Sequence, residues 1–194
     1  VGSMPYIEYV YDDFLCYPQF LHAQGYTTMA LHSYDKNFYS RDEAYPAMGF
    51  DLFVGQEAFD EEDRVGNYVG DSATLEKALE LYRSAGDAPV FLHVVTMQNH
   101  IPNQPGEYPD DYAVKAVIEG ESDYYNGCLS SVATSLRDTD RAIGEFIDAL
   151  REEDRDVVVL FFGDHQTNIN GDQGEDLLEH IESFTSLPQE EQQK

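Results

Sequence analysis

The chain has 194 residues, enough for one globular domain with a full hydrophobic core. Hydrophobic residues make up 42% of it, including 14 Tyr and 11 Phe, and this composition excludes an intrinsically disordered segment. The 38 acidic and 11 basic residues give a formal net charge of −27, which argues against binding to nucleic acid or to an anionic membrane surface.

Two further features concern where the protein works. No apolar run is as long as a membrane span, and residues 1–20 lack the pattern of a signal peptide. A form that works outside the cell would therefore need a targeting segment beyond these residues. The two cysteines, Cys16 and Cys128, permit one disulfide or none and leave the redox compartment open.

Helices and strands alternate along the first half of the chain. Apolar periodicity and turn residues predict, in order, a helix over 18–25, a strand over 26–31, a helix over 40–48, a strand over 50–54, an acidic loop over 56–70 and a helix over 71–85. Ser40 and Glu43 have the spacing of a capping box at the start of the second helix. We interpret the acidic loop as solvated surface.

The second half continues the alternation. It carries a strand over 89–96, a loop over 101–120, an amphipathic helix over 131–150, a strand over 157–162 and a further short helix over 175–184. A loop as long as 101–120 is often functional in a compact domain. The whole order predicts an α/β fold with a mainly parallel sheet flanked by helices.

The stretch from Val157 to His165 has six bulky apolar residues followed by Gly, Asp and His. Such a run is typical of a strand buried on both faces in the middle of a parallel sheet. Open α/β sheets bind their ligands at the carboxyl ends of the strands, where Asp164 and His165 would lie. The pair therefore predicts a metal site, and the alternative is a solvated Asp beside a capping His.

Three predicted strands are followed by a histidine: His32, His100 and His165. Because the carboxyl ends of parallel strands lie along one edge of a sheet, we expect these three to face one cleft with Asp164. That convergence would make a metal or phosphate site. The histidines at positions 22, 93 and 180 receive structural interpretations, on a first helix, inside a strand and on a terminal helix.

The run from His32 to Phe53, HSYDKNFYSRDEAYPAMGFDLF, resembles the lipoteichoic acid synthases. These are phosphoglycerol transferases of the sulfatase and alkaline phosphatase superfamily. The shared pattern is a His, then an aromatic pair and an Arg, then Tyr and a Gly-aromatic-Asp-x-Phe run. Three later matches follow in the family's order: Asn99-His100 with Ile101-Pro102, the helix segment 140–144, and Gly163-Asp164-His165.

The resemblance implies a role for each matching residue. Asp164 and His165 would be two ligands of a catalytic divalent metal ion, Mn²⁺ in the first place with Zn²⁺ or Mg²⁺ as alternatives, and two further ligands are expected outside this chain. His100 would lie beside the phosphoryl group as hydrogen-bond donor or as acid to the leaving oxygen. The phosphoglycerol head group would be held by His32, Tyr39 and Arg41. A metal ion, an Arg fork and imidazoles together neutralise phosphoryl oxygens.

The chain also departs from the family pattern. Tyr39 stands where the family commonly has Trp, and Tyr34 stands where an acidic residue can occur. The family's threonine nucleophile and its upstream Glu ligand have no counterpart. We therefore expect residues 1–194 to be a single-domain fragment of a sulfatase-like catalytic domain, incomplete at both ends and inactive alone. The alternative is a natural chain that kept the fold and lost the chemistry.

The implied function is transfer of phosphoglycerol from an anionic lipid to a threonine, and then to a cell-surface polymer or glycan. The parent protein is expected to be anchored in a bacterial cell membrane by segments outside this chain, with its active site on the extracellular face and no nucleic-acid partner. One alternative is a phosphoethanolamine transferase or a sulfatase or phosphodiesterase of the same superfamily. Another is a non-catalytic relative that binds a phosphorylated glycan, and the last is an acidic globule with scattered histidines.

Overall fold

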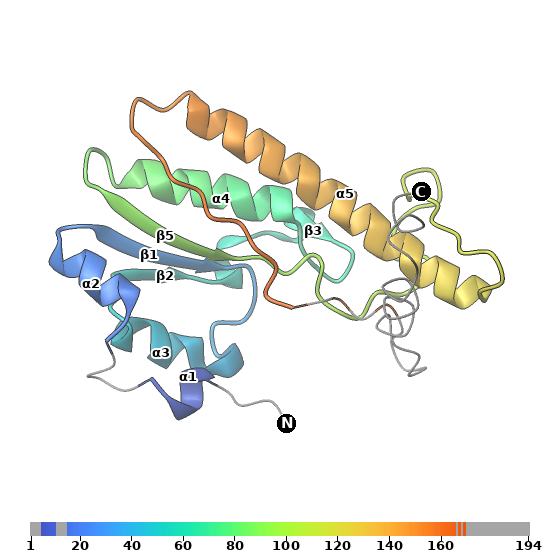
Figure 1. Cartoon of the computed structure of the whole chain (residues 1–194), viewed down its shortest axis with the longest axis horizontal. Coiled ribbons are helices and arrows are strands. Elements are labelled where there is room, and N and C mark those ends of the chain that lie inside the picture. Colours follow the sequence, from blue (N-terminus) through green and yellow to red (C-terminus); the bar gives the residue numbers. More distant parts are fainter. Residues whose placement is uncertain (1–4, 11–14, 166, 168, 170–194) are drawn as a thin grey trace, which may run out of the picture. The chain divides into compact units, whose positions relative to one another are not determined.

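The computed structural model describes residues 5–10, 15–165, 167 and 169 (Figure 1). The chain forms two compact units. The first unit comprises residues 1–98 and 138–157, and the second comprises 99–137 and 158–194. The assignment of residues 1–194 to a single domain stays a prediction. No helix among the described residues is both long and apolar enough to cross a bilayer.

A three-stranded parallel sheet forms the centre of the first unit. Its strands are β1 (Thr27–His32), β2 (Leu52–Val54) and β5 (Val90–Val95), in the order β2-β1-β5. Thr27 pairs with Val90 and His32 with Val95, so β1 and β5 run side by side over their full lengths. The predicted α/β class with a mainly parallel sheet is confirmed.

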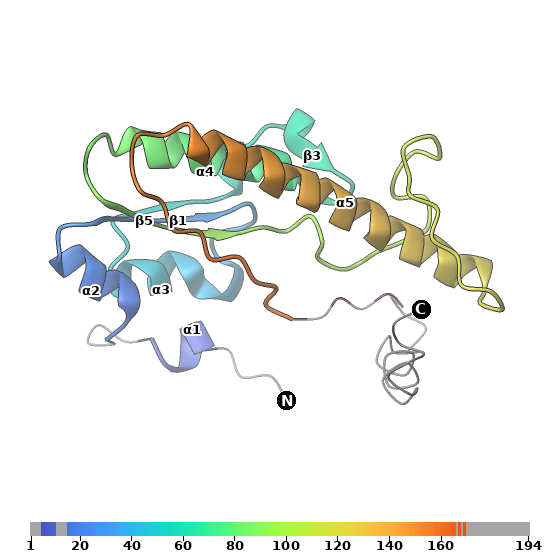
Figure 2. The ribbon, with the colours of Figure 1, turned by 45° about the horizontal axis from the view of Figure 1, so that its top comes forward.

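Helices cover both faces of this sheet (Figure 2). They are α2 (Tyr17–Ala23) and α3 (Arg41–Ala47) on one face and α4 (Asp71–Ser84) on the other. On the α3 side, Ala30, Tyr45 and Phe50 form a buried cluster, with Phe53 and Phe91 packed against it. Burial of each large apolar side chain stabilises the fold by about 1.5–3 kcal/mol. The predicted helices and strands that make up this core are all present.

Short elements connect the larger ones. They are α1 (Pro5–Glu8), the 3₁₀ turns η1 (Phe38–Ser40), η2 (Gln56–Ala58) and η3 (Glu61–Asp63), and a hairpin of β3 (Arg64–Val65) and β4 (Tyr68–Val69). The predicted acidic loop therefore contains a small antiparallel hairpin. Tyr39 and Ser40 both have positive φ, 60° and 53°.

The predicted capping box at Ser40 is wrong. Ser40 does precede α3, but its side chain makes no capping hydrogen bond. An N-cap side chain reaches the helix N–H groups from an extended backbone, whereas Ser40 is left-handed. The tight turn from η1 into α3 thus replaces the cap that the spacing of Ser40 and Glu43 predicts.

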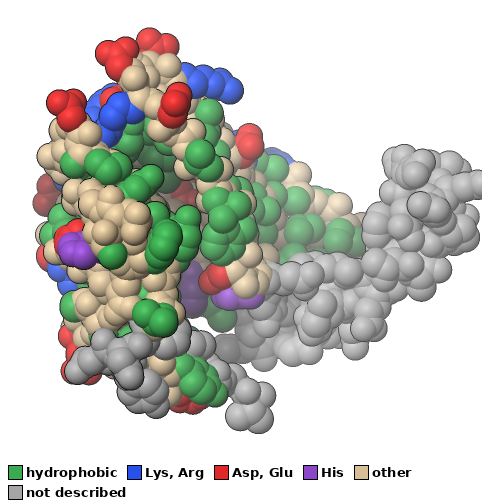
Figure 3. Space-filling model, turned by 60° about the vertical axis from the view of Figure 1, so that its left-hand side comes forward, with side chains coloured by type: hydrophobic (Ala, Val, Ile, Leu, Met, Phe, Trp, Pro, Cys, Tyr) green, Lys and Arg blue, Asp and Glu red, His purple; other side chains and the backbone are tan. Residues whose placement is uncertain are grey.

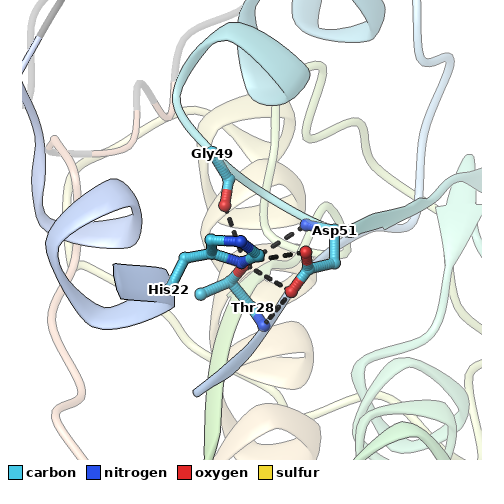
Figure 4. Close-up of polar contacts among 4 residues, drawn as sticks. All are labelled: His22, Thr28, Gly49 and Asp51. Carbon is cyan, nitrogen blue, oxygen red and sulfur yellow. Dashed lines mark hydrogen bonds and ion pairs between the residues drawn. The ribbon is translucent and has the colours of Figure 1, made fainter. Parts of the chain in front are cut away.

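A cluster of polar side chains lies at the amino end of the sheet (Figure 4). One carboxylate oxygen of Asp51 accepts hydrogen bonds from the backbone N–H of Thr28 at 2.8 Å and from its hydroxyl at 2.9 Å. The other oxygen lies 3.0 Å from Nδ1 of His22, and the Thr28 hydroxyl lies 2.7 Å from the carbonyl of Gly49. These contacts fasten α2, β1 and the entry to β2 to one another.

Hydrophobic side chains are also exposed on the first unit. On α2, Tyr17 is 63% and Phe20 60% exposed, and the Tyr17 ring lies 5.7 Å from that of Phe91. Figure 3 views the molecule from the left-hand side of Figure 1, and hydrophobic side chains gather on the face that it shows. Aromatic side chains of α2 are therefore exposed on the surface of the first unit.

The long helix α5 (Asp123–Arg151) begins earlier than the predicted residue 131. Its first turns belong to the second unit, where Tyr125, Cys128 and Val132 form a buried cluster with Ile169. A Cβ atom on Gly127 would lie 2.6 Å from Cβ of Pro105, so this helix position must be glycine for the loop to pack against it. Both cysteines are free thiols.

Residues 157–162 differ most from the sequence-based expectation. They form no strand, and Val158 and Leu160 are 96% and 81% exposed. The predicted buried strand is therefore wrong for this structure. Strand propensity forms a strand only where a neighbouring backbone supplies hydrogen bonds, and among the described residues β5 pairs with β1 alone. The helix predicted over 175–184 lies outside the described residues.

Candidate functional site

His32 ends β1 and is almost completely buried, with 1% of its surface exposed. Its Nδ1 lies 3.1 Å from the backbone carbonyl of Val95 on β5. Because a carbonyl only accepts, Nδ1 carries the proton and Nε2 is the nitrogen with the lone pair in the neutral ring. The pairing of β1 with β5 thus fixes both the orientation and the tautomer of this imidazole.

Arg41 is the first residue of α3 and is also buried, with 8% exposure. Nη1 donates a 2.9 Å hydrogen bond to the carbonyl of Phe38. The guanidinium carbon lies 5.5 Å from the ring of Tyr6, 5.8 Å from that of Phe38 and 5.3 Å from that of Tyr39. Aromatic faces attract a cation without neutralising its charge.

No carboxylate among the described residues pairs with Arg41, and its Nε is buried without a hydrogen-bond acceptor there. The structural alternative for this residue, an ion pair with Asp42 or Glu43, is therefore not seen in the described part of the chain. Removing a charge from water is costly unless an opposite charge compensates it. A ligand anion would supply that compensation.

The positive charge of Arg41 also acts on the core behind it. Burial lowers the pKa of His93, and the Arg41 charge lowers it further. Burial likewise raises the pKa of Tyr45 above its ordinary range. His93 is thus neutral at pH 7, in agreement with its interpretation as a core histidine, and neither residue offers Arg41 a negative charge.

The residues that sequence reasoning missed are the aromatic neighbours of this site. Phe38 touches Tyr39 at 4.3 Å between ring centroids, and Tyr34 links the His32 ring at 6.1 Å to the Phe38 ring at 5.4 Å. Both Tyr34 and Phe38 lie inside the run that carries the resemblance. The sequence feature that could have identified them is the high density of aromatic residues between His32 and Arg41.

His100 belongs to the second unit. Its Nδ1 lies 2.7 Å from the carbonyl of Ile101, so this ring is held by its own loop. Asn103 in the same loop is buried and donates a 3.2 Å hydrogen bond to the hydroxyl of Thr167. The loop of His100 is thereby joined to the segment that follows His165.

Asp164 and His165 are exposed, with side-chain exposures of 80% and 64%. Oδ1 of Asp164 accepts a 2.9 Å hydrogen bond from the His165 backbone, and Oδ2 lies 3.6 Å from Nε2 of His165. A carboxylate and an imidazole are suitable donors for a divalent ion. No group of three or more His, Cys, Asp or Glu side chains surrounds an ion position among the described residues, so the pair fits in chemistry but is not a complete site.

The predicted site residues thus fall into two sets. His32, Tyr39 and Arg41 belong to the first unit, and His100, Asp164 and His165 belong to the second. Within the first set, the Tyr39 and Arg41 side chains touch, and Tyr34 links His32 to their neighbour Phe38. Convergence of the three histidines on one cleft stays a prediction.

Comparison with known proteins identifies the chain's relatives. The sequence profile of the sulfatase family matches residues 1–192. A putative cyclic beta-1,2-glucan modification protein of Rhizobium meliloti (strain 1021) is 28% identical over 87% of this chain, which spans 26% of that protein. The chain therefore spans about a quarter of the length of this curated relative.

Two solved structures show the same fold. The lipoteichoic acid synthase LtaP from Listeria monocytogenes has a TM-score of 0.55 and 28% identity, over 70% of this chain and 32% of LtaP. The phosphoglycerol transferase GacH from Streptococcus pyogenes, solved with sn-glycerol-1-phosphate, has a TM-score of 0.54 and 25% identity, over 68% of this chain and 34% of GacH. The resemblance read from the motifs is confirmed, and the chain belongs to the sulfatase family, within the alkaline phosphatase superfamily that includes the lipoteichoic acid synthases.

Proposed function

We propose that this protein is a phosphoglycerol transferase that moves phosphoglycerol from an anionic lipid to a cell-surface polymer or glycan. The observation that carries the proposal is Arg41, a buried cation for which the described residues provide no carboxylate. A phosphate diester or monoester carries the missing negative charge. The similarity to GacH, a phosphoglycerol transferase solved with sn-glycerol-1-phosphate, supports glycerol phosphate as the head group.

Each residue of the first unit has a defined task in this proposal. The Arg41 fork binds two non-bridging phosphate oxygens, since its hydrogen bond to Phe38 uses only one of its five N–H donors. Tyr39 is 43% exposed and lies against the guanidinium, where it can cover the glycerol carbons. His32 presents the lone pair of Nε2 to a hydroxyl group of the same head group, from which it can accept a hydrogen bond.

The remaining roles in the proposed reaction belong to residues of the second unit. His100 lies beside the phosphoryl group and donates a hydrogen bond or a proton to the leaving oxygen. Asp164 and His165 provide two ligands to a divalent ion, with Mn²⁺ the expected ion and Zn²⁺ or Mg²⁺ as alternatives. When bound, this ion would neutralise charge that develops on the phosphoryl oxygens.

The reaction balances as a transesterification. The phosphorus–oxygen bond to the lipid breaks, a phosphorus–oxygen bond to the acceptor hydroxyl forms, and the proton of that hydroxyl ends on the released lipid alcohol. We further propose that residues 1–194 are inactive alone, because they offer no counterpart of the family's threonine nucleophile. Membrane anchoring and an active site on the extracellular face are proposals for the full protein.

The test is an assay of the full-length gene product with radiolabelled phosphatidylglycerol. Arg41→Lys should lower transfer about 30- to 100-fold, because a point charge cannot replace two parallel hydrogen bonds. Arg137→Lys is the matched control, since Arg137 also donates to a carbonyl at 2.9 Å and lies over a tyrosine ring at 4.3 Å. Chelation of divalent metal should abolish transfer.

Two outcomes would contradict the proposal. One is an Arg41→Lys variant that is as active as the Arg137→Lys control. The other is turnover of phosphatidylethanolamine or of an aryl sulfate ester in preference to phosphatidylglycerol, which would assign the protein to another reaction of the superfamily.

A further inference from the structure

We propose that Asn103 is a positioning residue, which links the loop of His100 to the segment that carries Asp164 and His165. The inference rests on the proposed function and deepens it, because it names what keeps the proposed acid and the proposed metal ligands at a fixed separation. It concerns the second unit alone, in which all of these residues lie.

Asn103 lies three residues after His100 and has only 4% of its surface exposed. Its Nδ2 donates a 3.2 Å hydrogen bond to Oγ1 of Thr167, and Thr167 lies two residues beyond His165. The bond therefore joins two segments that each carry a residue of the proposed site. Breaking it would leave a buried amide donor unsatisfied, which costs about 1–3 kcal/mol.

The residues that follow Asn103 are fixed by α5. The hydroxyl of Ser131 donates a 2.6 Å hydrogen bond to the carbonyl of Gln104. A Cβ atom on Gly127 would lie 2.6 Å from Cβ of Pro105, so the loop lies directly against the helix at this point. Asn103 is thus followed at once by two residues whose positions depend on α5.

Further along the loop, α5 holds an extended stretch at regular intervals. Three side chains spaced four residues apart on the helix accept hydrogen bonds from every second backbone N–H of the stretch. The pairs, with the helix residue first, are Thr134 with Val114, Ser130 with Ala116 and Asn126 with Ile118, at 2.9, 3.1 and 2.8 Å. Four helical residues rise about 6.0 Å and two extended residues about 6.6 Å, so the two spacings match. These bonds order residues 101–120, although that segment forms no helix or strand.

The polar character of these contacts favours positioning over stability alone. Thr134 is completely buried and Ser131 is 4% exposed, and apolar side chains of the same shape could fill such places at little net cost in stability. A hydrogen bond has a preferred distance and angle, so it fixes the loop in one register. A general acid has to lie within hydrogen-bond reach of the leaving oxygen, and a displacement of about 1 Å can cost about 100-fold in rate.

The experiment uses Thr167→Val in the full-length gene product, since Val keeps the shape of Thr and removes the hydroxyl. The kcat for transfer from phosphatidylglycerol should fall about 10- to 100-fold, with KM unchanged within about twofold. Thr167→Ser should restore kcat because it keeps the hydroxyl. In the double variant with Asn103→Ala, the loss should be smaller than the product of the two single losses. The matched control is Thr74→Val in α4 of the first unit, where a buried hydroxyl donates a 3.0 Å hydrogen bond to the carbonyl of Gly70.

Two further measurements do not depend on transfer. In Thr167→Val, hydrogen exchange over residues 99–106 of the metal-free protein should become about tenfold faster, and the Kd for Mn²⁺ measured by calorimetry should rise about tenfold. The Thr74→Val control should show neither change and should keep the wild-type kcat.

A protein that transfers no phosphoglycerol but shows both changes in Thr167→Val would overturn the proposed function and keep this inference. The inference is overturned if Thr167→Val lowers kcat no more than Thr74→Val does. It is also overturned if Thr167→Val lowers only the free energy of unfolding and leaves loop exchange and Mn²⁺ binding at their wild-type values.

Discussion

The charged groups near the two ends of β1 differ in how far the fold compensates their charge. At the amino end, the Asp51 carboxylate is paired with the backbone and hydroxyl of Thr28 and with His22, so its charge is satisfied within the fold. Beyond the carboxyl end, the Arg41 guanidinium is buried against three rings and one carbonyl with no carboxylate among the described residues. The first arrangement explains stability, and the second indicates a ligand.

A third charged residue shows why Arg41 is informative. Asp71 at the start of α4 is completely buried, and burial raises the pKa of its carboxyl group. Its Oδ2 accepts a 2.6 Å hydrogen bond from the Thr139 hydroxyl. A carboxyl group can relieve the cost of burial by taking up a proton, whereas a guanidinium stays charged at any physiological pH. Of these three charged residues, Arg41 is therefore the one whose charge the described part of the chain leaves without an opposite charge.

The largest change in stability is expected for Asp51→Ala. The substitution leaves the buried amide of Thr28 without its charged acceptor, while the hydroxyl keeps the Gly49 carbonyl, and should lower the free energy of unfolding by about 2–3 kcal/mol. Asp148→Ala, which removes a carboxylate that is 74% exposed, should change it by less than about 0.5 kcal/mol. Urea denaturation measures both. Equal effects of the two substitutions would show that the amino-end cluster is not what stabilises the strand.

A smaller effect of opposite sign is expected for Asp71→Asn. Because the folded-state pKa of Asp71 is raised, the stability it contributes is complete in acid and is lost as the pH rises through that pKa. An amide cannot ionise, so Asp71→Asn should raise the free energy of unfolding by about 0.5–2 kcal/mol at neutral pH and leave it unchanged near pH 3. Thermal unfolding across this pH range tests the sign, and a loss of stability at pH 7 would contradict it.

Much of the first unit was predictable from sequence. The strands β1 and β5 and the helix α4 are marked by apolar runs between turn residues, and each lies within a residue or two of its predicted bounds. Residues 157–162 carry an equally strong apolar run but are exposed, because composition does not reveal which backbone would pair with them. The capping-box prediction at Ser40 was wrong for a similar reason. The spacing of Ser40 and Glu43 predicts where the helix starts but not the left-handed turn before it.

The candidate site was predictable in part. The motifs single out His32, Tyr39 and Arg41, and the local turn from η1 into α3 brings the last two into contact. The burial of Arg41 and its aromatic neighbours depends on packing between α1, α3 and the loop after β1, which periodicity does not contain. Tyr6 contacts Arg41 from a helix far upstream in the sequence, and no motif includes it.

The most direct test of the central claim measures the stability and ligand binding of Arg41→Met in the full-length gene product. Met keeps apolar contact with the three rings but removes the charge. Without ligand, the free energy of unfolding of the variant should equal that of the wild type or exceed it by about 1–3 kcal/mol. With sn-glycerol phosphate added, the wild type should become more stable and the variant should not. A variant that loses stability and is still stabilised by sn-glycerol phosphate would contradict it, and would make Arg41 a structural residue.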